Sequence, residues 1–290
     1  MKLYKTTLIP ESNFATSLKG DTLFGQMCWS IRHLLGEEKL KELLFDYETS
    51  PFLVVSDGFA SGYLPKPKLP RAFLGENPDE KKANRKKNWL RLEDLQHGNF
   101  SNAIEVTKDK TFTVMRNSIN YKTFSTDDSG AFSPYGVDEM HIEPKDVYCL
   151  IDEERFALDV LSHVFDFLRS YGYGKDTTIG KGRFAFESFE AVDVGKSTTT
   201  VMALSPFCPE GLVCEKLYYE PFTRFGKKGG DRAHQNPFKK PLLLADTASV
   251  IRFAQPLQSL FVGKAILGHS THSDIVHQGY AIALPIKELL

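Results

Sequence analysis

The sequence has little cysteine and no long apolar stretch. Its 290 residues include 4 cysteines, Cys28, Cys149, Cys208 and Cys214, which lie far apart and form no C-x-x-C pair. This spacing argues against a disulfide framework or a structural zinc site and favours reduced, buried thiols. No run of about 18 apolar residues, the minimum for a membrane span, is present, and "MKLYKTTLIP" lacks the apolar core of a signal peptide. We therefore expect a cytoplasmic protein that does not enter a membrane.

The sequence also lacks an excess of charge of either sign. It contains 36 basic and 37 acidic residues, which gives a formal net charge of −1. The total therefore gives no sign of nucleic-acid binding, but a balanced total can hide local basic patches. Two such patches are present. Residues 81–91 contain six basic residues and no acid, and residues 224–240 form a second basic stretch with glycines and phenylalanines.

The order of the expected elements in residues 1–195 indicates a ferredoxin-like (RRM-like) domain. Alternating or apolar segments predict strands at 2–9, 51–61, 146–152 and 183–194. Apolar residues at helical spacing predict helices at about 21–35 and 153–172, with Asp21 as the N-cap of the first helix. Strand, helix, strand, strand, helix, strand is the order of that fold.

The rest of the chain is predicted to form an insertion and a second domain. Residues at about 62–145 are rich in proline and polar residues, and they include a strand followed by a long loop or hairpin. Residues 196–290 contain mostly strand candidates and no strong amphipathic helix. We predict an α+β protein of tandem ferredoxin-like (RRM-like) domains. Residues 1–195 form the first with its insertion, and residues 196–290 form a β-rich, degenerate second.

A loop with four glycines and three basic residues follows the second predicted helix, in "SYGYGKDTTIGKGRF", residues 170–184. A P-loop has a glycine five positions before its Gly-Lys pair, but five positions before Gly180 this sequence has Lys175. A G-x-G-x-x-G motif that starts at Gly172 requires a glycine at position 177, which is Thr177. Both motifs also place the loop between a strand and a helix, whereas this loop runs from helix to strand. A nucleotide-binding enzyme is therefore a poor interpretation.

Glycines allow a backbone to approach a ligand closely, and basic side chains neutralise phosphates. We therefore favour a clamp on a phosphodiester backbone, formed by Gly172, Gly174, Lys175, Gly180, Lys181, Gly182 and Arg183. The alternative is that the glycines only end the helix and turn the chain, with Gly172 in a position suited to a helix C-terminus.

Each catalytic motif that the sequence resembles lacks a required residue. The H-x-E triplet at His141 has no matching P-C-x-x-C, and "GHSTH" at 268–272 lacks the closing glycine of a nucleophile elbow. His269, His272 and His277 could form a metal cluster or supply an acid and base for RNA cleavage, but surface histidines are the simpler explanation. We expect no catalytic residues, no metal and no cofactor.

Other stretches have the residue types that contact single-stranded RNA. "MRNSINYK" combines basic, amide and aromatic side chains, which hydrogen-bond and stack on unpaired bases. The predicted RNA-binding set outside the glycine loop is Lys19, Arg116, Asn117, Asn120, Lys122, Arg224, Lys227 and Lys228.

Taken in order, "LKGDTLFGQMCW", "LPKPKLP", "RNSINYKTF", "YGYGKDTTIGKGRF" and "HQGYAIALPI" resemble the RAMP superfamily of CRISPR-Cas proteins. Within it, the chain looks most like the fourth Csm subunit of type III-A effector complexes. The resemblance covers most of the chain. The glycine loop is typical of the superfamily, whereas "GDTLFG" and "GYAIALPI" point to this subunit.

The resemblance implies two RRM-like halves and a non-catalytic, RNA-binding scaffold subunit in antiviral defence. It would cap the 5′ handle of the crRNA and dock a large polymerase-like subunit and a backbone RAMP subunit, with RNA and DNA cutting left to those partners. The family's glycine-loop role carries onto Gly172, Gly174, Gly180 and Gly182. Three alternatives remain open. They are a metal-independent, histidine-dependent RAMP endoribonuclease that matures crRNA, the equivalent subunit of another type III complex, and a purely protein-binding adaptor.

Overall fold

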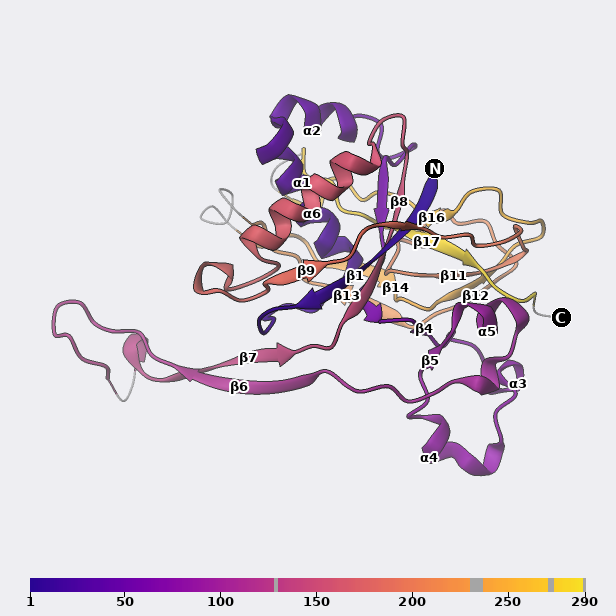
Figure 1. Cartoon of the computed structure of the whole chain (residues 1–290), viewed down its shortest axis with the longest axis horizontal. Helices are drawn as coiled ribbons and strands as arrows, with labels where there is room; N and C mark the ends of the chain where they lie inside the picture. Colours follow the sequence, from indigo (N-terminus) through magenta and orange to yellow (C-terminus); the bar gives the residue numbers. More distant parts are fainter. Residues whose placement is uncertain (128–129, 230–236, 271–273, 289–290) are drawn as a thin grey trace.

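A computed structural model describes residues 1–127, 130–229, 237–270 and 274–288 of the chain. It contains two main antiparallel sheets, a group of helices over the first sheet, and a long hairpin that projects from the body (Figure 1). Within these described residues, no helix has both the length and the apolar character that crossing a membrane requires.

The first sheet has the strand order predicted for residues 1–195. Its strands are β1 (Lys2–Pro10), β2 (Leu53–Val55), β3 (Phe59–Ala60), β8 (Lys145–Ile151), β9 (Phe184–Phe186) and β10 (Glu190–Ala191). β1 pairs with β8 on one side and with β9 and β10 on the other, while β2 and β3 pair with β8. All these pairings are antiparallel. The order fourth, first, third, second strand, with helices after the first and third, is the β-α-β-β-α-β arrangement.

Three helices cover one face of this sheet, namely α1 (Gly20–Leu35), α2 (Glu37–Leu44) and α6 (Leu158–Tyr171) (Figure 1). The apolar residues that repeat at helical spacing are buried: Leu23, Phe24, Met27 and Ile31 in α1, and Leu161, Val164, Phe165 and Leu168 in α6. Asp21 is not the N-cap that the sequence predicted. It lies inside α1, and the N–H of Gly20 is instead bonded by the Asp57 carboxylate at 2.8 Å.

The segment between β3 and β8 lies outside the first sheet, where the sequence predicts an insertion. Its elements are β4 (Leu64–Pro65), α3 (Arg71–Leu74), η1 (Pro78–Glu80), α4 (Lys81–Asn84), β5 (Trp89–Leu90), α5 (Leu92–His97), η2 (Phe100–Asn102), β6 (Lys110–Arg116), η3 (Gly130–Phe132) and β7 (Tyr135–His141). β6 and β7 form the projecting hairpin, which confirms the hairpin alternative for this segment (Figure 1).

The second sheet contains β11 (Thr200–Ala203), β12 (Lys216–Tyr218), β15 (Val250–Arg252), β16 (Phe261–Gly263) and β17 (Tyr280–Pro285), in the order β12-β15-β11-β17-β16. β13 (Pro221–Arg224) and β14 (Leu242–Ala245) form a separate pair. Every strand candidate predicted after residue 196 contains a strand. The tandem ferredoxin-like arrangement is not confirmed, because the strand order differs and the described residues of this half contain no α-helix.

The two sheets share one hydrophobic core. Met202, Val250, Ile282 and Leu284 of the second sheet belong to the same buried cluster as α1, β2 and β8. A smaller cluster around Phe207 and Val262 covers the other side of the second sheet. The division at residue 195 therefore separates two sheets but not two independent cores.

A buried amide fastens the halves to each other. The side chain of Gln278 accepts a hydrogen bond from the N–H of Val55 at 2.9 Å and donates one to the C=O of Val55 at 2.8 Å. Gln278 is 0% exposed, so neither backbone group has access to water. The Gln278 side chain thus gives Val55 of β2 the two hydrogen bonds that a neighbouring strand would otherwise provide.

We expect Gln278→Ala to lower the free energy of unfolding by about 2 to 4 kcal/mol, because two buried backbone groups lose their partners. Urea denaturation followed by circular dichroism measures the change. The matched control is Gln258→Ala, since Gln258 is exposed and should change stability by less than about 0.5 kcal/mol. Equal stabilities of the two variants would contradict this role for Gln278.

Candidate nucleic-acid interface

The predicted glycine loop is a rigid turn between α6 and β9. Gly172 ends α6 with φ 97°, and its N–H donates to the C=O of Leu168 at 2.7 Å. Gly182, with φ 71°, passes so close to Tyr173 that a Cβ would lie 2.0 Å from the Tyr173 carbonyl oxygen. These two glycines are therefore required by the path of the chain itself.

Most backbone N–H groups of the loop donate within the protein. Gly174 and Lys175 donate to the side chains of Gln26 and Thr16, at 3.2 and 3.0 Å. Protein acceptors also bind the backbone N–H groups of six further loop residues, namely Tyr173, Ile179, Gly180, Lys181, Gly182 and Arg183. These amides are thus engaged, and a phosphate would have to be bound by side chains.

An ion-pair network joins the loop to the hairpin. Glu139 of β7 accepts hydrogen bonds from Lys181 at 2.5 Å and from Arg116 of β6 at 2.8 Å. Arg116 also donates to Asp176 of the loop at 2.8 Å. The hydrogen bond from Lys181, with those from Arg116 and Asn13, lowers the pKa of Glu139 to about 2. The buried carboxylate therefore holds both cations at the root of the hairpin.

The remaining two basic residues of the loop differ in their surroundings. The guanidinium of Arg183 donates to the C=O of Ser170. The side chain of Lys175 is exposed, and in the described part of the chain it has no hydrogen-bond or ion-pair partner. Lys175 is therefore the loop cation most available to a phosphate.

Beyond the network, the hairpin ends in a loop with exposed rings. Tyr121 and Phe124 are 85% and 83% exposed, and Lys122 and Asn117 are exposed beside them. Asn120 organises this turn, because its side-chain oxygen accepts the N–H of Lys122 at 3.0 Å. The sequence predicted base stacking for the aromatic residue of "MRNSINYK", Tyr121, but not for Phe124.

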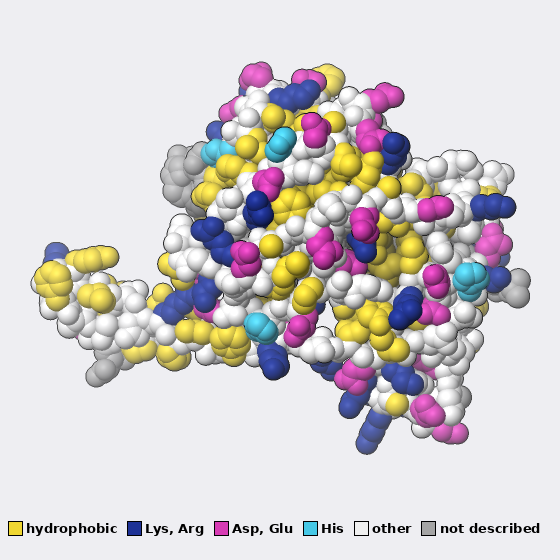
Figure 2. All heavy atoms as spheres, in the orientation of Figure 1, with side chains coloured by type: hydrophobic (Ala, Val, Ile, Leu, Met, Phe, Trp, Pro, Cys, Tyr) yellow, Lys and Arg dark blue, Asp and Glu magenta, His cyan; other side chains and the backbone are white. Residues whose placement is uncertain are grey.

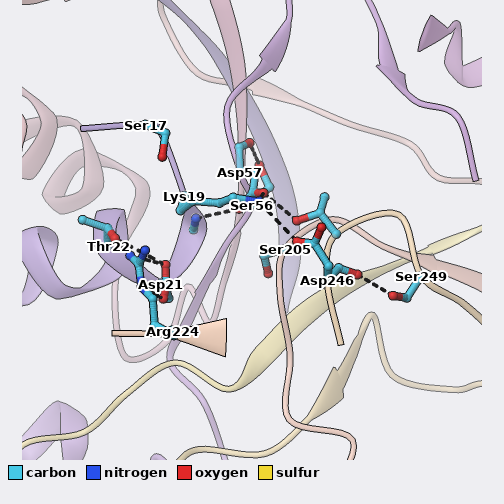
Figure 3. Close-up of polar contacts among 12 residues, drawn as sticks. Ser17, Lys19, Asp21, Thr22, Ser56, Asp57, Ser205, Arg224, Asp246 and Ser249 are labelled. Carbon is cyan, nitrogen blue, oxygen red and sulfur yellow. Dashed lines mark hydrogen bonds and ion pairs between the residues drawn. The ribbon is translucent and has the colours of Figure 1, made fainter. Parts of the chain in front are cut away.

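Two predicted RNA-binding residues lie in ion pairs at the junction of the two halves (Figure 3). Lys19 donates to Asp57 at 2.8 Å and to Asp246 at 3.3 Å. Arg224 pairs with Asp21 at 2.7 Å. Their charges are already compensated inside the protein.

The second basic stretch is divided by the structure. Lys227 is exposed, with its ammonium 5.0 Å from the ring centroid of Phe238, whereas Lys228 is buried. Residues 230–236 of this stretch lie outside the described residues.

The structure thus groups Arg116, Lys181, Asn13 and the glycines in one place and leaves Lys19 and Arg224 in another. Sequence reasoning missed their acidic partners, Glu139, Asp176, Asp57, Asp246 and Asp21. No local signal could have identified them, because the partners are up to 227 positions apart.

Two of the three histidines considered for catalysis are buried. His269 and His277 are 3% and 7% exposed, and their rings pack edge to face with centroids 5.6 Å apart. His272 lies outside the described residues. Among the side chains that the structure places, no group of three or more His, Cys, Asp or Glu residues could hold a metal ion.

No protein-family model matches the sequence, and no curated protein matches it. Solved structures, in contrast, match along the whole chain. A chain of the Csm1–Csm4 cassette in complex with AMPPNP aligns with a TM-score of 0.63 and 17% identity, over 99% of this chain and 98% of that chain. The cassette in complex with pppApA gives 0.62 and 17%, over the same shares.

A chain of the Csm3–Csm4 subcomplex in the type III-A CRISPR-Cas interference complex aligns with a TM-score of 0.62 and 14% identity, over 99% of this chain and 100% of that chain. The chain therefore has a fold found among subunits of type III CRISPR effector complexes. Csm4 is the subunit that both kinds of complex contain. The resemblance inferred from the sequence is confirmed at the level of the fold.

The buried histidines predict how stability depends on pH. Burial lowers the pKa of His277 to about 4, with Arg224, Lys239 and His269 acting in the same direction and Asp21 opposing them. Burial and the nearby Lys239 also lower the pKa of His269 to about 4. Below the usual histidine pKa the unfolded chain binds protons that the folded chain does not. Stability should therefore fall as the pH drops from about 6.5 to 4.

We expect His277 alone to lower the free energy of unfolding by about 2 kcal/mol between pH 6.5 and pH 5. The double variant His269→Gln/His277→Gln should lose less stability over this range than the wild type. The control His163→Gln alters an exposed histidine and should retain the wild-type slope. Urea denaturation at several pH values measures all three, and identical slopes would show that the buried pair does not titrate as described.

Proposed function

We propose that this chain is a non-catalytic RNA-binding scaffold subunit of a type III-A CRISPR effector complex, and that it holds the 5′ handle of the crRNA. The observation that carries this proposal is the full-length likeness to chains from the Csm1–Csm4 cassette and the Csm3–Csm4 subcomplex. A subunit common to both would dock a large, Csm1-like polymerase subunit and a Csm3-like backbone RAMP subunit. It would act in the cytoplasm, in antiviral defence.

The glycine loop serves here as a rigid support rather than as a cradle of free amides. Its backbone is bonded to Thr16, Gln26 and its own residues, so the loop presents Lys175 at a fixed position. A lysine that contacts a phosphate releases a counterion, and this release favours binding at low salt. We therefore assign the phosphate contact to Lys175. Lys181 and Arg116 are held in ion pairs with Glu139 and support the loop.

The hairpin would supply the base contacts. Tyr121 and Phe124 present large exposed ring surface, and unpaired bases stack on such rings without regard to sequence. The Arg116–Asp176 ion pair fixes the hairpin relative to the loop. Phosphate and base contacts would then be held at a set spacing, while target sequence is read by pairing with the guide.

Two of the alternative functions, an endoribonuclease and a protein-binding adaptor, require different features of the structure. An endoribonuclease needs a histidine within reach of the RNA, but His269 and His277 are buried. This favours a non-catalytic role, and purified protein should leave repeat RNA uncut. A protein-binding adaptor would not need Lys175 or the exposed rings of the hairpin.

We expect Lys122→Ala/Lys175→Ala to reduce crRNA retention severalfold, because the phosphate contact of Lys175 and the exposed positive charge of Lys122 beside the hairpin rings are lost. Adding Tyr121→Ala should weaken binding further, by about 1 to 3 kcal/mol for one stacked base. The chain is co-expressed with its partner subunits and a guide RNA, and the purified complex is assayed for RNA per protein. These side chains are exposed, so the fold should be preserved.

The matched control is Lys39→Ala/Lys41→Ala, which removes the same charge from α2. This control should retain crRNA at the wild-type level. If the loop variant also retains it while partner subunits still bind, the adaptor is the better description. Cleavage of repeat RNA by the purified wild-type protein would instead favour the endoribonuclease.

A further inference from the structure

A second concentration of positive charge lies apart from the glycine loop. We call residues 71–91, which include α3, η1, α4 and β5, the basic module. It contains 7 basic and 3 acidic residues, a formal charge of +4. Its cations are Arg71, Lys81, Lys82, Arg85, Lys86, Lys87 and Arg91, and all but Lys87 are exposed.

These cations have no acidic partners within the part of the chain that the structure describes. Glu76, one of the module's three acids, is turned toward the interior. Its carboxylate pairs with Lys66 at 2.7 Å, and both side chains are largely buried. Asp79 and Glu80 of η1 are exposed just before α4, but among the described residues they form no ion pair with the module's lysines or arginines.

Hydrogen bonds and a strand pair hold the module in place. Lys66 also donates to the C=O of Asn84 at 3.1 Å, and the buried Asn84 side chain donates to the C=O of Asn77 at 3.0 Å. β5 pairs with β4, which matches Leu64 with Leu90. The cations therefore project from an ordered support.

The lysines of α2 differ from those of the module, because each of them forms an ion pair. In α2, Lys39 pairs with Glu42 at 2.7 Å and Lys41 with Glu38 at 2.9 Å. The basic module thus combines exposed charge with the absence of described ion pairs. Figure 2 shows dark blue side chains projecting along the lower edge of the molecule, where Figure 1 places α4.

The composition of the module favours a phosphate backbone over a protein partner. Protein interfaces are enriched in aromatic residues and methionine at their centre and are depleted in lysine. The module has four exposed or half-buried lysines, and Phe73 is its one large apolar side chain among the exposed ones. Phosphates, in contrast, are bound by lysine and arginine without apolar contact.

We propose that the basic module is a second nucleic-acid-binding surface, which holds the phosphate backbone of a strand without reading its sequence. The proposal goes beyond crRNA-handle binding, because the module lies away from the glycine loop (Figure 1). A strand bound there is a different stretch of nucleic acid from the one held at the loop. Contacts to phosphates alone carry no sequence information.

The test uses the purified full-length chain and a fluorescein-labelled oligouridine of about 20 nucleotides, with anisotropy measured between about 50 and 200 mM salt. The module variant is Lys82→Ala/Arg85→Ala/Lys86→Ala. We expect its affinity at the lowest salt to fall at least about tenfold. The slope of log K against log salt should become shallower by about 2, since each phosphate contact to a single strand contributes about 0.7.

The matched control, Lys2→Ala/Lys39→Ala/Lys41→Ala, removes the same charge from the far end of the molecule (Figure 1), where Lys2 and Lys41 are exposed and Lys39 is half-buried. It should bind within about twofold of the wild type, since scattered charges contribute little. Module and control variants with equal affinity and equal salt slope would overturn the proposal. So would a wild-type chain that does not bind oligouridine.

A third arm separates this proposal from the proposed function. Lys122→Ala/Lys175→Ala is measured in the same assay and in the assembled complex. If only that variant loses crRNA, the handle site is supported. The proposal for the basic module is then judged by the salt slope of the module variant. If the module variant binds oligouridine normally but loses a partner subunit from the complex, the surface binds protein and the proposal is wrong.

Discussion

The buried carboxylate of Asp57 is the contact on which the arrangement of the chain depends (Figure 3). It accepts hydrogen bonds from the N–H of Gly20 at 2.8 Å, from Lys19 at 2.8 Å and from the hydroxyl of Thr247 at 2.5 Å. Burial raises the pKa of Asp57, and these partners act against that rise. A buried charge of this kind is tolerated only with its partners present, so the start of α1 and the second half are fixed together.

This junction also determines where the glycine loop lies. The residues just before Lys19 contact the loop, because Thr16 accepts the N–H of Lys175 and the C=O of Ser17 accepts the hydroxyl of Tyr173 at 2.8 Å. The loop is therefore positioned from the start of α1 on one side and from Glu139 on the other. Gly172, Gly174 and Gly182 allow this close packing, whereas Gly180 has open space around it and a positive φ of 84°.

Sequence periodicity predicted the strands and both main helices of the first half, because each depends on nearby residues, and their order along the chain indicated the arrangement of the first sheet. It could not predict which acids neutralise which cations. Asp21 looks like an N-cap in sequence, yet it pairs with Arg224, 203 positions away. The strands of the second half were also predicted, but the order in which they pair is set by long-range packing, and the tandem arrangement was not confirmed for that reason. The glycine motif alone fitted both a phosphate clamp and a helix end.

The near-zero net charge of the chain conceals an uneven distribution that only the fold reveals. Lys19, Lys181, Arg116 and Arg224 are neutralised by acids that folding brings to them. These pairs fix the halves, the loop and the hairpin in place, so their cations serve the architecture first. Lys175 and the basic module carry exposed cations with no ion-pair partner among the described residues. A polyanion that contacted both would have to span the distance between them, which suits an extended strand better than a compact ligand.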